Sequence, residues 1–164
     1  MTHSDRLTIE SVDLAGLQRL GSWMVQHLKP PLVIGLVGTL GAGKTSLAQA
    51  LARAAGIDDA DVTSPTFTLL QTYQGSIRVH HLDAYRVADE DEFLELGVQE
   101  LFADQAAWTL IEWADRVDSV MPTDALWIEI KIDDDEHRSV VFKTEHPSTR
   151  AALNQVAEDL RQPS

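Results

Sequence analysis

The sequence predicts an α/β protein whose central sheet is mostly parallel and carries antiparallel hairpins, and three observations support this prediction. An apolar, β-prone run at residues 32–37 leads into a glycine-rich loop at residues 38–45 and then into a helix-forming run at residues 46–55. A second apolar run, residues 106–111, has the length and composition of a buried parallel strand. Paired β-rich runs separated by short polar turns predict the hairpins.

The glycine-rich loop has the pattern Gly-x-x-x-x-Gly-Lys-Thr, which is typical of a P-loop when a strand precedes it and a helix follows. Its glycines let backbone N–H groups approach a triphosphate, and the start of the following helix adds partial positive charge. Lys44 is expected to reach the β- and γ-phosphates, and the Thr45 hydroxyl to bind Mg²⁺. We therefore predict a three-layer P-loop NTPase-like fold. The predicted nucleotide-binding residues of this segment are Gly38, Thr39, Leu40, Gly41, Ala42, Gly43, Lys44, Thr45 and Ser46.

The segment before the loop predicts one strand and one helix. Residues 7–9 are a short strand candidate, and Ser11 or Asp13 suits a helix N-cap. Apolar residues then recur at helical spacing, which predicts a helix over residues 12–28 with one buried face. A Pro-Pro pair ends this helix.

The segment after the loop helix predicts a hairpin and two short helices. Residues 69–73 and 76–82 are the strands of the hairpin. The acidic run at residues 89–92 opens a helix, because carboxylates are stabilised at the positive end of a helix. This helix is expected to turn Phe93, Leu94 and Leu96 inward, and a second helix to cover residues 98–102.

The C-terminal part predicts a second hairpin and a closing helix. Residues 127–132 and 138–142 are the strands, and the acidic turn between them is expected to be solvated rather than to bind a cation. The closing helix is expected over residues 149–160. With a chain of 164 residues and no evident linker, we expect a single P-loop ATPase domain, residues 1–164.

Composition excludes several classes of function. The absence of cysteine excludes disulfides, zinc–thiolate sites and cysteine nucleophiles. No apolar run approaches the roughly 18 residues of a membrane span, and the N-terminus has no signal pattern, so we expect a cytoplasmic protein without a membrane partner. The formal net charge of −13 repels nucleic-acid backbones, so a role on RNA is expected to depend on a protein partner.

Nucleotide hydrolysis requires a carboxylate near Mg²⁺ or the attacking water, and such acids lie at the carboxyl ends of strands. Two acidic residues occupy such positions. Asp83 follows the run 77–82, and Glu112 follows the apolar run 106–111. Either alone would fit a helix cap or a surface acid. Together with a P-loop, they predict one acid that binds Mg²⁺ through water and one that aligns the nucleophile. The sequence leaves open which acid takes which role.

A third candidate element is the segment Ser64-Pro65-Thr66, which is either a turn or a loop that senses the γ-phosphate and supplies the Thr66 hydroxyl. His80 and His81 are neighbours in a strand and point to opposite faces, so packing or hydrogen bonding is expected rather than joint metal binding.

The remaining conspicuous residues give weaker predictions. Arg86 would neutralise transferred charge or pair with a carboxylate, and Trp108, Trp113 and Trp127 are expected in the core or an interface. The guanine-reading motifs Asn-Lys-x-Asp and Thr-Lys-x-Asp of GTPases are missing, which favours adenine.

Taken together, these motifs closely resemble the TsaE (YjeE) family. The matching segments are residues 38–45, 64–68, 81–86, 95–97 and 111–113, and the resemblance runs from about Leu7 to Ile132. It implies a small Mg²⁺-dependent ATPase that acts with the TsaB–TsaD pair to form threonylcarbamoyladenosine next to the anticodon of tRNAs reading ANN codons. ATP hydrolysis would support repeated turnover and be weak in isolation, and tRNA would be reached through the complex.

By position, the resemblance implies roles in phosphate, Mg²⁺ and water binding for Lys44, Thr45, Thr66, Asp83 and Glu112, with Trp113 beside them. It also implies nucleotide contact near the start of the first helix, at Asp13. Thr39 departs from the family pattern, which has an acid there. Backbone N–H groups do not depend on that side chain, so ATP binding should survive, whereas hydrolysis or partner coupling could change.

Two rival functions fit part of the same pattern. A small-molecule or nucleoside kinase would use Asp83 as the base and Arg86 as a phosphate clamp, although a lid with clustered arginines is not evident. A protein-binding module would use ATP only to order its partner surface. The first rival predicts a phosphorylated metabolite, and the second predicts that Glu112 is dispensable.

Overall fold

The computed structural model describes residues 6–58 and 69–161, which contain one seven-stranded sheet and the helices that cover it. The strands are β1 (Arg6–Val12), β2 (Leu32–Val37), β3 (Leu70–Gln74), β4 (Arg78–Asp83), β5 (Ala107–Glu112), β6 (Leu126–Ile132) and β7 (Arg138–Lys143). The helices are α1 (Leu14–His27), α2 (Lys44–Ala54), α3 (Glu90–Leu94), α4 (Val98–Phe102), the 3₁₀ helix η3 (Ala114–Val120), α5 (Pro147–Leu153) and α6 (Val156–Arg161).

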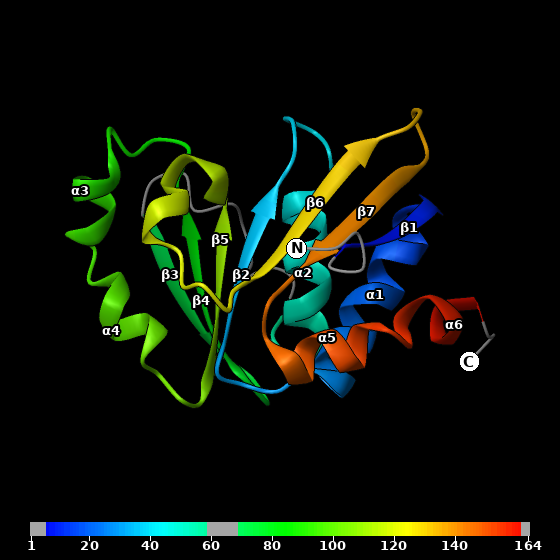
Figure 1. Cartoon of the computed structure of the whole chain (residues 1–164), viewed down its shortest axis with the longest axis horizontal. Coiled ribbons are helices and arrows are strands. Elements are labelled where there is room, and N and C mark those ends of the chain that lie inside the picture. The colour runs from blue at the N-terminus through cyan, green and yellow to red at the C-terminus, as the bar shows by residue number, and fades with distance from the viewer. Residues whose placement is uncertain (1–5, 59–68, 162–164) are drawn as a thin grey trace.

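The sheet has the strand order β1-β7-β6-β2-β5-β4-β3 and a parallel centre (Figure 1). Strand β2 pairs in parallel with β5 and β6, and β4 pairs in parallel with β5. The flanking pairs β3–β4, β6–β7 and β1–β7 are antiparallel. The predicted α/β fold with a parallel centre and two hairpins is therefore confirmed.

Helices cover both faces of the sheet and give the predicted three layers. Helices α1, α2, α5 and α6 enclose one hydrophobic core with the inner side chains of β2, β6 and β7. Helices α3, α4 and η3 enclose a second core on the opposite face, against residues such as Leu82 and Ile111. Strand β5 contributes to both cores, because all six of its residues are buried. This double coverage explains its continuous apolar run.

The elements around the P-loop lie close to their predicted positions. Asp13 is the N-cap of α1, and its Oδ1 accepts a hydrogen bond of 2.8 Å from the backbone N–H of Gly16. Strand β1 is longer than the predicted residues 7–9, because it extends along the edge of β7 as far as Val12. Partners along a sheet edge come from distant sequence, so local composition did not predict this length.

Two predictions near the helices were wrong. The expected closing helix over residues 149–160 is divided into α5 and α6 at Asn154 and Gln155, and it begins earlier because Pro147 occupies the first turn. Leu94 does not face inward: it is 36% exposed, whereas Phe93 is fully buried. Adjacent side chains point in different directions on a helix. In the five residues of α3, Phe93 is the side chain that reaches the core.

At the amino end of the parallel strands, an ionic cluster links β3 and β4 to the segment before β5. Asp104 Oδ2 accepts hydrogen bonds from Arg78 Nη1 at 2.7 Å and from His80 Nε2 at 2.9 Å. The other ring nitrogen of His80, Nδ1, lies 2.9 Å from Thr72 Oγ1. The hydrogen bond from Arg78, then those from His80 and the Ala106 N–H, lower the pKa of Asp104 to about 2.

We expect Asp104→Asn to lower stability at neutral pH and to abolish part of the acid dependence of unfolding. Because the folded-state pKa lies below the ordinary value of 3.8, the stabilisation is complete above about pH 4 and is lost as pH falls through about 2. Urea midpoints of the variant and the unchanged chain should therefore converge between pH 4 and pH 2. The exposed Glu145→Gln substitution is the charge-matched control, and a constant difference across this range would contradict the prediction.

Candidate functional site

The carboxyl ends of the parallel strands bring the predicted site residues to one edge of the sheet. The P-loop leaves β2 at this edge, between the ends of β5 and β6 (Figure 1). Asp83 and Glu112 are register partners at the ends of β4 and β5, and Glu112 is also the register partner of Leu36 in β2. The two predicted acids therefore lie beside each other and beside the P-loop. Such an edge is the usual ligand site of open α/β sheets.

The geometry of the P-loop backbone explains the glycines at positions 38 and 43. A Cβ on Gly38 would lie 2.6 Å from the carbonyl oxygen of Ile130 in β6, so no side chain fits. Gly43, the N-cap of α2, has a φ of 120°, which side chains rarely allow. Thr39 and Leu40 are exposed between them. The Thr39 side chain is thus not part of the backbone cradle, in agreement with the expectation that the cradle does not depend on it.

Lys44 is held inside the loop in this structure. Its Nζ donates hydrogen bonds to the carbonyl oxygens of Gly38 at 2.7 Å and Thr39 at 2.9 Å, and lies 4.0 Å from the ring centroid of Trp113. Burial lowers the pKa of Lys44, and the nearby carboxylates, Glu112 foremost, raise it in part. The ammonium group is therefore positioned beside the acids, with neutral partners that a phosphate oxygen could replace.

Thr45 and Glu112 form the central polar contact of the site. The Thr45 hydroxyl donates a hydrogen bond of 2.9 Å to Glu112 Oε1. The other carboxylate oxygen, Oε2, lies 2.6 Å from Nε2 of His81, and both Glu112 and His81 are buried. The residue predicted to bind Mg²⁺ and one of the two predicted acids are thus in direct contact.

Asp83 has a different environment from Glu112. Its Oδ1 accepts a hydrogen bond of 2.8 Å from the backbone N–H of Tyr85, which fixes the carboxylate at the turn after β4. The Tyr85 ring packs against Trp113, with centroids 4.8 Å apart, and Trp113 in turn lies under Lys44. Trp113 therefore lies beside the candidate site residues, where the family resemblance placed it.

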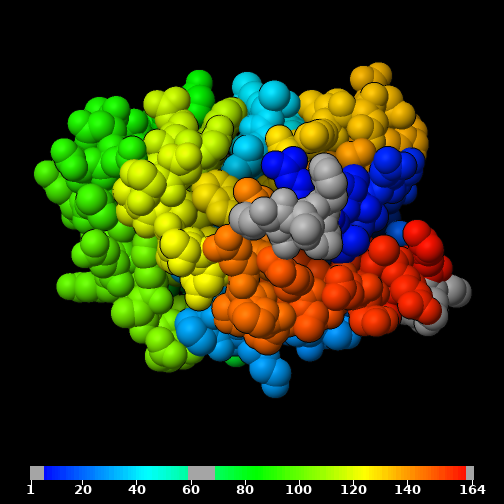
Figure 2. All heavy atoms as spheres, viewed as in Figure 1, coloured from blue at the N-terminus to red at the C-terminus, as the bar shows by residue number. Residues whose placement is uncertain are grey.

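A pocket of about 470 Å³ adjoins the P-loop, and Asp13 is among the residues that line it; its contact with a nucleotide stays a prediction. Its walls are the start of α1, the loop itself and the acidic β6–β7 turn, including Asp135 and Glu136. In the space-filling view the loop, in light blue, reaches the upper edge of the molecule beside the yellow and orange atoms of β6 and β7 (Figure 2). The pocket thus lies directly beside the glycine loop.

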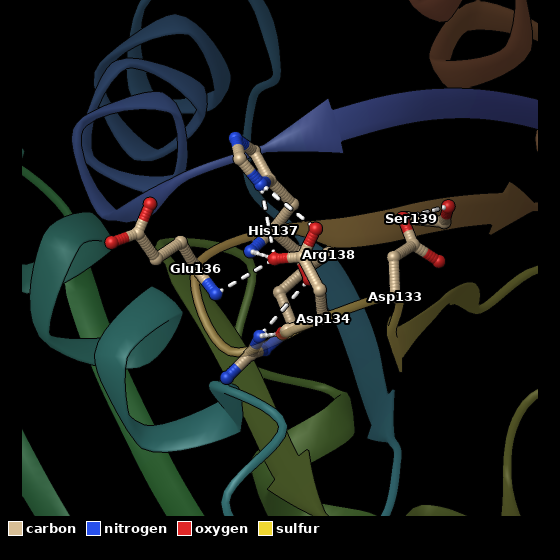
Figure 3. Close-up of polar contacts among 6 residues, drawn as sticks. All are labelled: Asp133, Asp134, Glu136, His137, Arg138 and Ser139. Atoms are coloured by element: carbon tan, nitrogen blue, oxygen red, sulfur yellow. Dashed lines mark hydrogen bonds and ion pairs between the residues drawn. The ribbon is translucent and has the colours of Figure 1, made fainter.

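The carboxylates of the β6–β7 turn accept hydrogen bonds from within the turn (Figure 3). Asp134 Oδ1 accepts hydrogen bonds from the backbone N–H groups of Glu136 and His137, both at 2.8 Å. Ser139 Oγ donates to Asp133 Oδ2 at 2.7 Å. Among residues 6–58 and 69–161, no group of three or more His, Asp or Glu side chains is arranged to hold a metal ion.

Arg138 connects this turn to the P-loop. Its Nε donates to the carbonyl oxygen of Ala42 at 2.9 Å, and Nη2 lies 3.4 Å from the carbonyl oxygen of Gly41. Its Nη1 donates to the carbonyl oxygen of Asp134 at 2.7 Å. By binding loop carbonyls from outside, Arg138 fixes the peptide planes whose N–H groups would contact phosphates.

We expect Arg138→Met to weaken ATP binding about tenfold, because loss of charge-assisted hydrogen bonds to the loop leaves its carbonyls free to reorient. Isothermal titration calorimetry measures this affinity. Arg150→Met is the matched control, since Arg150 also donates two hydrogen bonds to one backbone carbonyl, that of Thr144, outside the P-loop pocket. Equal affinity of both variants would contradict the role given to Arg138.

A larger hollow, about 630 Å³, lies between α1, α2 and α6 and is lined by residues such as Trp23 and Arg53. It contains no P-loop residue and neither of the acids Asp83 and Glu112. Size alone would favour it as a ligand site. The chemistry favours the smaller pocket, because Gly41, Ala42 and Gly43 of the P-loop line it. Lys44 and the contact between Thr45 and Glu112 follow directly on this stretch of the loop.

The other predicted residues have mixed outcomes. Thr66 and its Ser-Pro-Thr segment lie outside the described residues, so their role stays a prediction. Trp108 is buried in the core as expected, and Arg86 is exposed. His80 and His81 contact different acids, as their opposite orientation predicted, with His80 joined to Asp104 and His81 to Glu112.

Sequence reasoning missed Arg138 and assigned His81 only a general hydrogen-bonding role. The signal for Arg138 was not local: its proximity depends on β6 lying beside β2, which turns the β6–β7 hairpin toward the P-loop edge. For His81 the alternation of the strand was informative. Residues 81 and 83 share one face of the sheet, and the register partner of Asp83 in β5 is Glu112, so Glu112 lies on the same face.

The parallel-centred sheet, the glycine loop with Lys44 and Thr45, and the acids that end β4 and β5 define a P-loop NTPase-like protein. The chain belongs to the TsaE family, since the family model described as "Threonylcarbamoyl adenosine biosynthesis protein TsaE" matches residues 11–140.

Individual relatives agree with this assignment. A protein of Treponema pallidum (strain Nichols) named tRNA threonylcarbamoyladenosine biosynthesis protein TsaE is 36% identical over 122 residues, which cover 74% of this chain and 89% of the relative. The protein of the same name from Bacillus subtilis (strain 168) is 40% identical over 115 residues, 70% of each chain. The crystal structure of Bacillus subtilis YdiB superimposes with a TM-score of 0.76 at 27% identity, covering 94% of this chain and 95% of that one.

The helices give no indication of a membrane span. Within residues 6–58 and 69–161, none of them combines the length and the apolar character that crossing a bilayer requires.

Proposed function

We propose that this chain binds ATP with Mg²⁺ at the P-loop and hydrolyses the ATP in support of threonylcarbamoyladenosine formation next to the anticodon of tRNAs reading ANN codons. The observation that carries the catalytic part is the 2.9 Å hydrogen bond between Thr45 Oγ1 of the P-loop and Glu112 Oε1 of β5. The tRNA part is supported by membership of the TsaE family and by the names of its relatives.

The residues present fit a magnesium–nucleotide complex. The close approach at Gly38 leaves room for backbone only, and Lys44 supplies a cation among displaceable carbonyl partners. Thr45 and Glu112 supply hard oxygen ligands, the kind that Mg²⁺ prefers. When bound, Mg²⁺ neutralises charge on the phosphate oxygens. The loop N–H groups and Lys44 bind and orient the phosphates.

The two acids have separate roles in this proposal. Glu112 takes the Mg²⁺ side, directly or through water, because it contacts the Thr45 hydroxyl. Asp83 aligns the nucleophilic water, because the Tyr85 N–H holds its carboxylate at the neighbouring strand end. Thr66 is proposed to approach the γ-phosphate side from the segment between α2 and β3.

Partner proteins are part of the proposal. We take residues 1–164 as one ATPase domain that acts with TsaD-like and TsaB-like proteins, and expect hydrolysis to be weak in their absence. The net charge of −13 supports contact with tRNA through these proteins rather than by strong direct binding.

Reconstitution tests the proposal. TsaB-like and TsaD-like proteins, the adenylate-forming enzyme, tRNA and ATP are incubated with and without this chain, and modified nucleoside is quantified by mass spectrometry. We expect many rounds of modification only when the chain is present. Unchanged multiple-turnover modification without it would contradict the proposal, and a phosphorylated metabolite in place of free phosphate would favour a kinase.

A further inference from the structure

His81 is a buried histidine whose position suggests a role in the site. It lies in β4 with a fully buried side chain, and its Nε2 is 2.6 Å from Glu112 Oε2. Glu112 itself is 2% exposed, so water cannot replace this contact. A buried carboxylate oxygen without a donor is unfavourable, because the oxygen loses its hydration without a compensating hydrogen bond.

The two oxygens of Glu112 are divided between two partners. Oε1 accepts the hydrogen bond of Thr45 at the P-loop, and Oε2 meets His81 on the opposite side. The plane of the carboxylate is therefore fixed by donors at both ends. Such a histidine behind a metal-binding carboxylate is a second layer of support, which in other metal sites orients the ligand.

The neighbouring histidine provides a comparison within the same strand. His80 uses both ring nitrogens, Nδ1 with Thr72 and Nε2 with Asp104, as a structural histidine does. The Nδ1 of His81 has no hydrogen-bond partner among the residues that the structure describes. The ring of Tyr73 lies 6.1 Å from that of His81 between centroids, tilted by 48°. Within the described residues, the polar character of His81 thus serves one contact, that with Glu112.

We propose that His81 is a positioning residue for the Mg²⁺ site: it donates from Nε2 to Glu112 Oε2 and keeps Oε1 directed at Thr45 and the cation. This inference rests on the proposed function, in which Glu112 takes the Mg²⁺ side. Without His81 as donor, the Glu112 carboxylate can rotate away from Thr45. Metal binding then includes the cost of reorienting this carboxylate.

The test measures metal binding rather than activity. Mn²⁺ replaces Mg²⁺ as a paramagnetic probe, and its affinity is measured by electron paramagnetic resonance with a non-hydrolysable ATP analogue bound. We expect His81→Leu to weaken Mn²⁺ binding about 10- to 100-fold, as for other supporting residues of metal sites. His81→Gln should restore affinity to within a few-fold, because its amide N–H can reach Oε2. Analogue binding in EDTA should be equal in all variants.

Two controls separate positioning from folding. His80→Leu removes the adjacent histidine and its bond to Asp104, and should lower the unfolding temperature without changing Mn²⁺ affinity. If His81→Leu does not fold, His81→Asn keeps a polar group that is too short to reach Oε2, and should weaken Mn²⁺ binding to a similar extent.

Each outcome decides the inference. Unchanged Mn²⁺ affinity in a folded His81→Leu or His81→Asn variant overturns it, and so does a His81→Gln variant as weak as His81→Leu. Glu112→Gln separates a failure of the His81 inference from a failure of the proposed function. If Glu112→Gln weakens Mn²⁺ binding while His81→Leu does not, only the positioning role of His81 is wrong. If neither substitution affects Mn²⁺, the metal assignment of the proposed function is wrong as well.

Discussion

Glu112→Gln is expected to reduce ATP hydrolysis about 100- to 1,000-fold while ATP binding in the absence of Mg²⁺ stays within a few-fold of the unchanged chain. The glutamine has nearly the same shape, and its carbonyl oxygen can still accept the hydrogen bond from Thr45. It lacks the negative charge that would hold the cation. The loss should therefore fall on the chemical step and not on the phosphate cradle.

The measurement is single-turnover hydrolysis of radiolabelled ATP in the presence of the partner proteins, since weak activity is expected without them. Asp115→Asn is the matched control, because Asp115 is an exposed acid near Lys44 that the proposal does not use. Hydrolysis by Glu112→Gln at the unchanged rate would remove Glu112 from the mechanism. It would favour the rival in which ATP only orders a partner surface.

The fold could be predicted because its signals are local. The P-loop pattern identifies a strand, a turn and a helix together, and a run such as 106–111 is apolar throughout only because helices cover both faces of β5. The division of the closing helix at Asn154 was not predictable in the same way. Turn-forming and helical conformations of such a residue differ little in free energy, so tertiary packing decides between them.

The site was predictable only where strand ends determine it. Asp83 and Glu112 each follow a strand, and parallel pairing brings such ends to one edge. Strand order was not encoded in any motif, so the approach of Arg138 to the loop could not be inferred. Similarly, alternation placed His80 and His81 on opposite faces, but only the register of β4 with β5 identifies Glu112 as the partner of His81.

Lys44→Met is expected to weaken ATP binding about 100-fold, which corresponds to about 2.7 kcal/mol. Lys44 is the one cation of the P-loop segment itself, and its ammonium group already lies among carbonyl oxygens that a phosphate oxygen can replace. A charge-assisted hydrogen bond in a buried site contributes about 1.5–3 kcal/mol. Calorimetric titration with ATP measures the change, and an unchanged affinity would contradict the P-loop assignment.

The same substitution separates function from stability. Burial lowers the pKa of Lys44 although Glu112, Asp115 and Asp83 act in the opposite direction, so its charged form is less favourable in the folded protein than in the unfolded chain. At pH values below the lowered pKa, the charge of Lys44 therefore opposes folding. Without nucleotide, Lys44→Met should unfold at a temperature no lower than that of the unchanged chain. A large decrease would mean that the contacts of Lys44 with Gly38, Thr39 and Trp113 stabilise the fold, and that lost binding reflects a disordered loop.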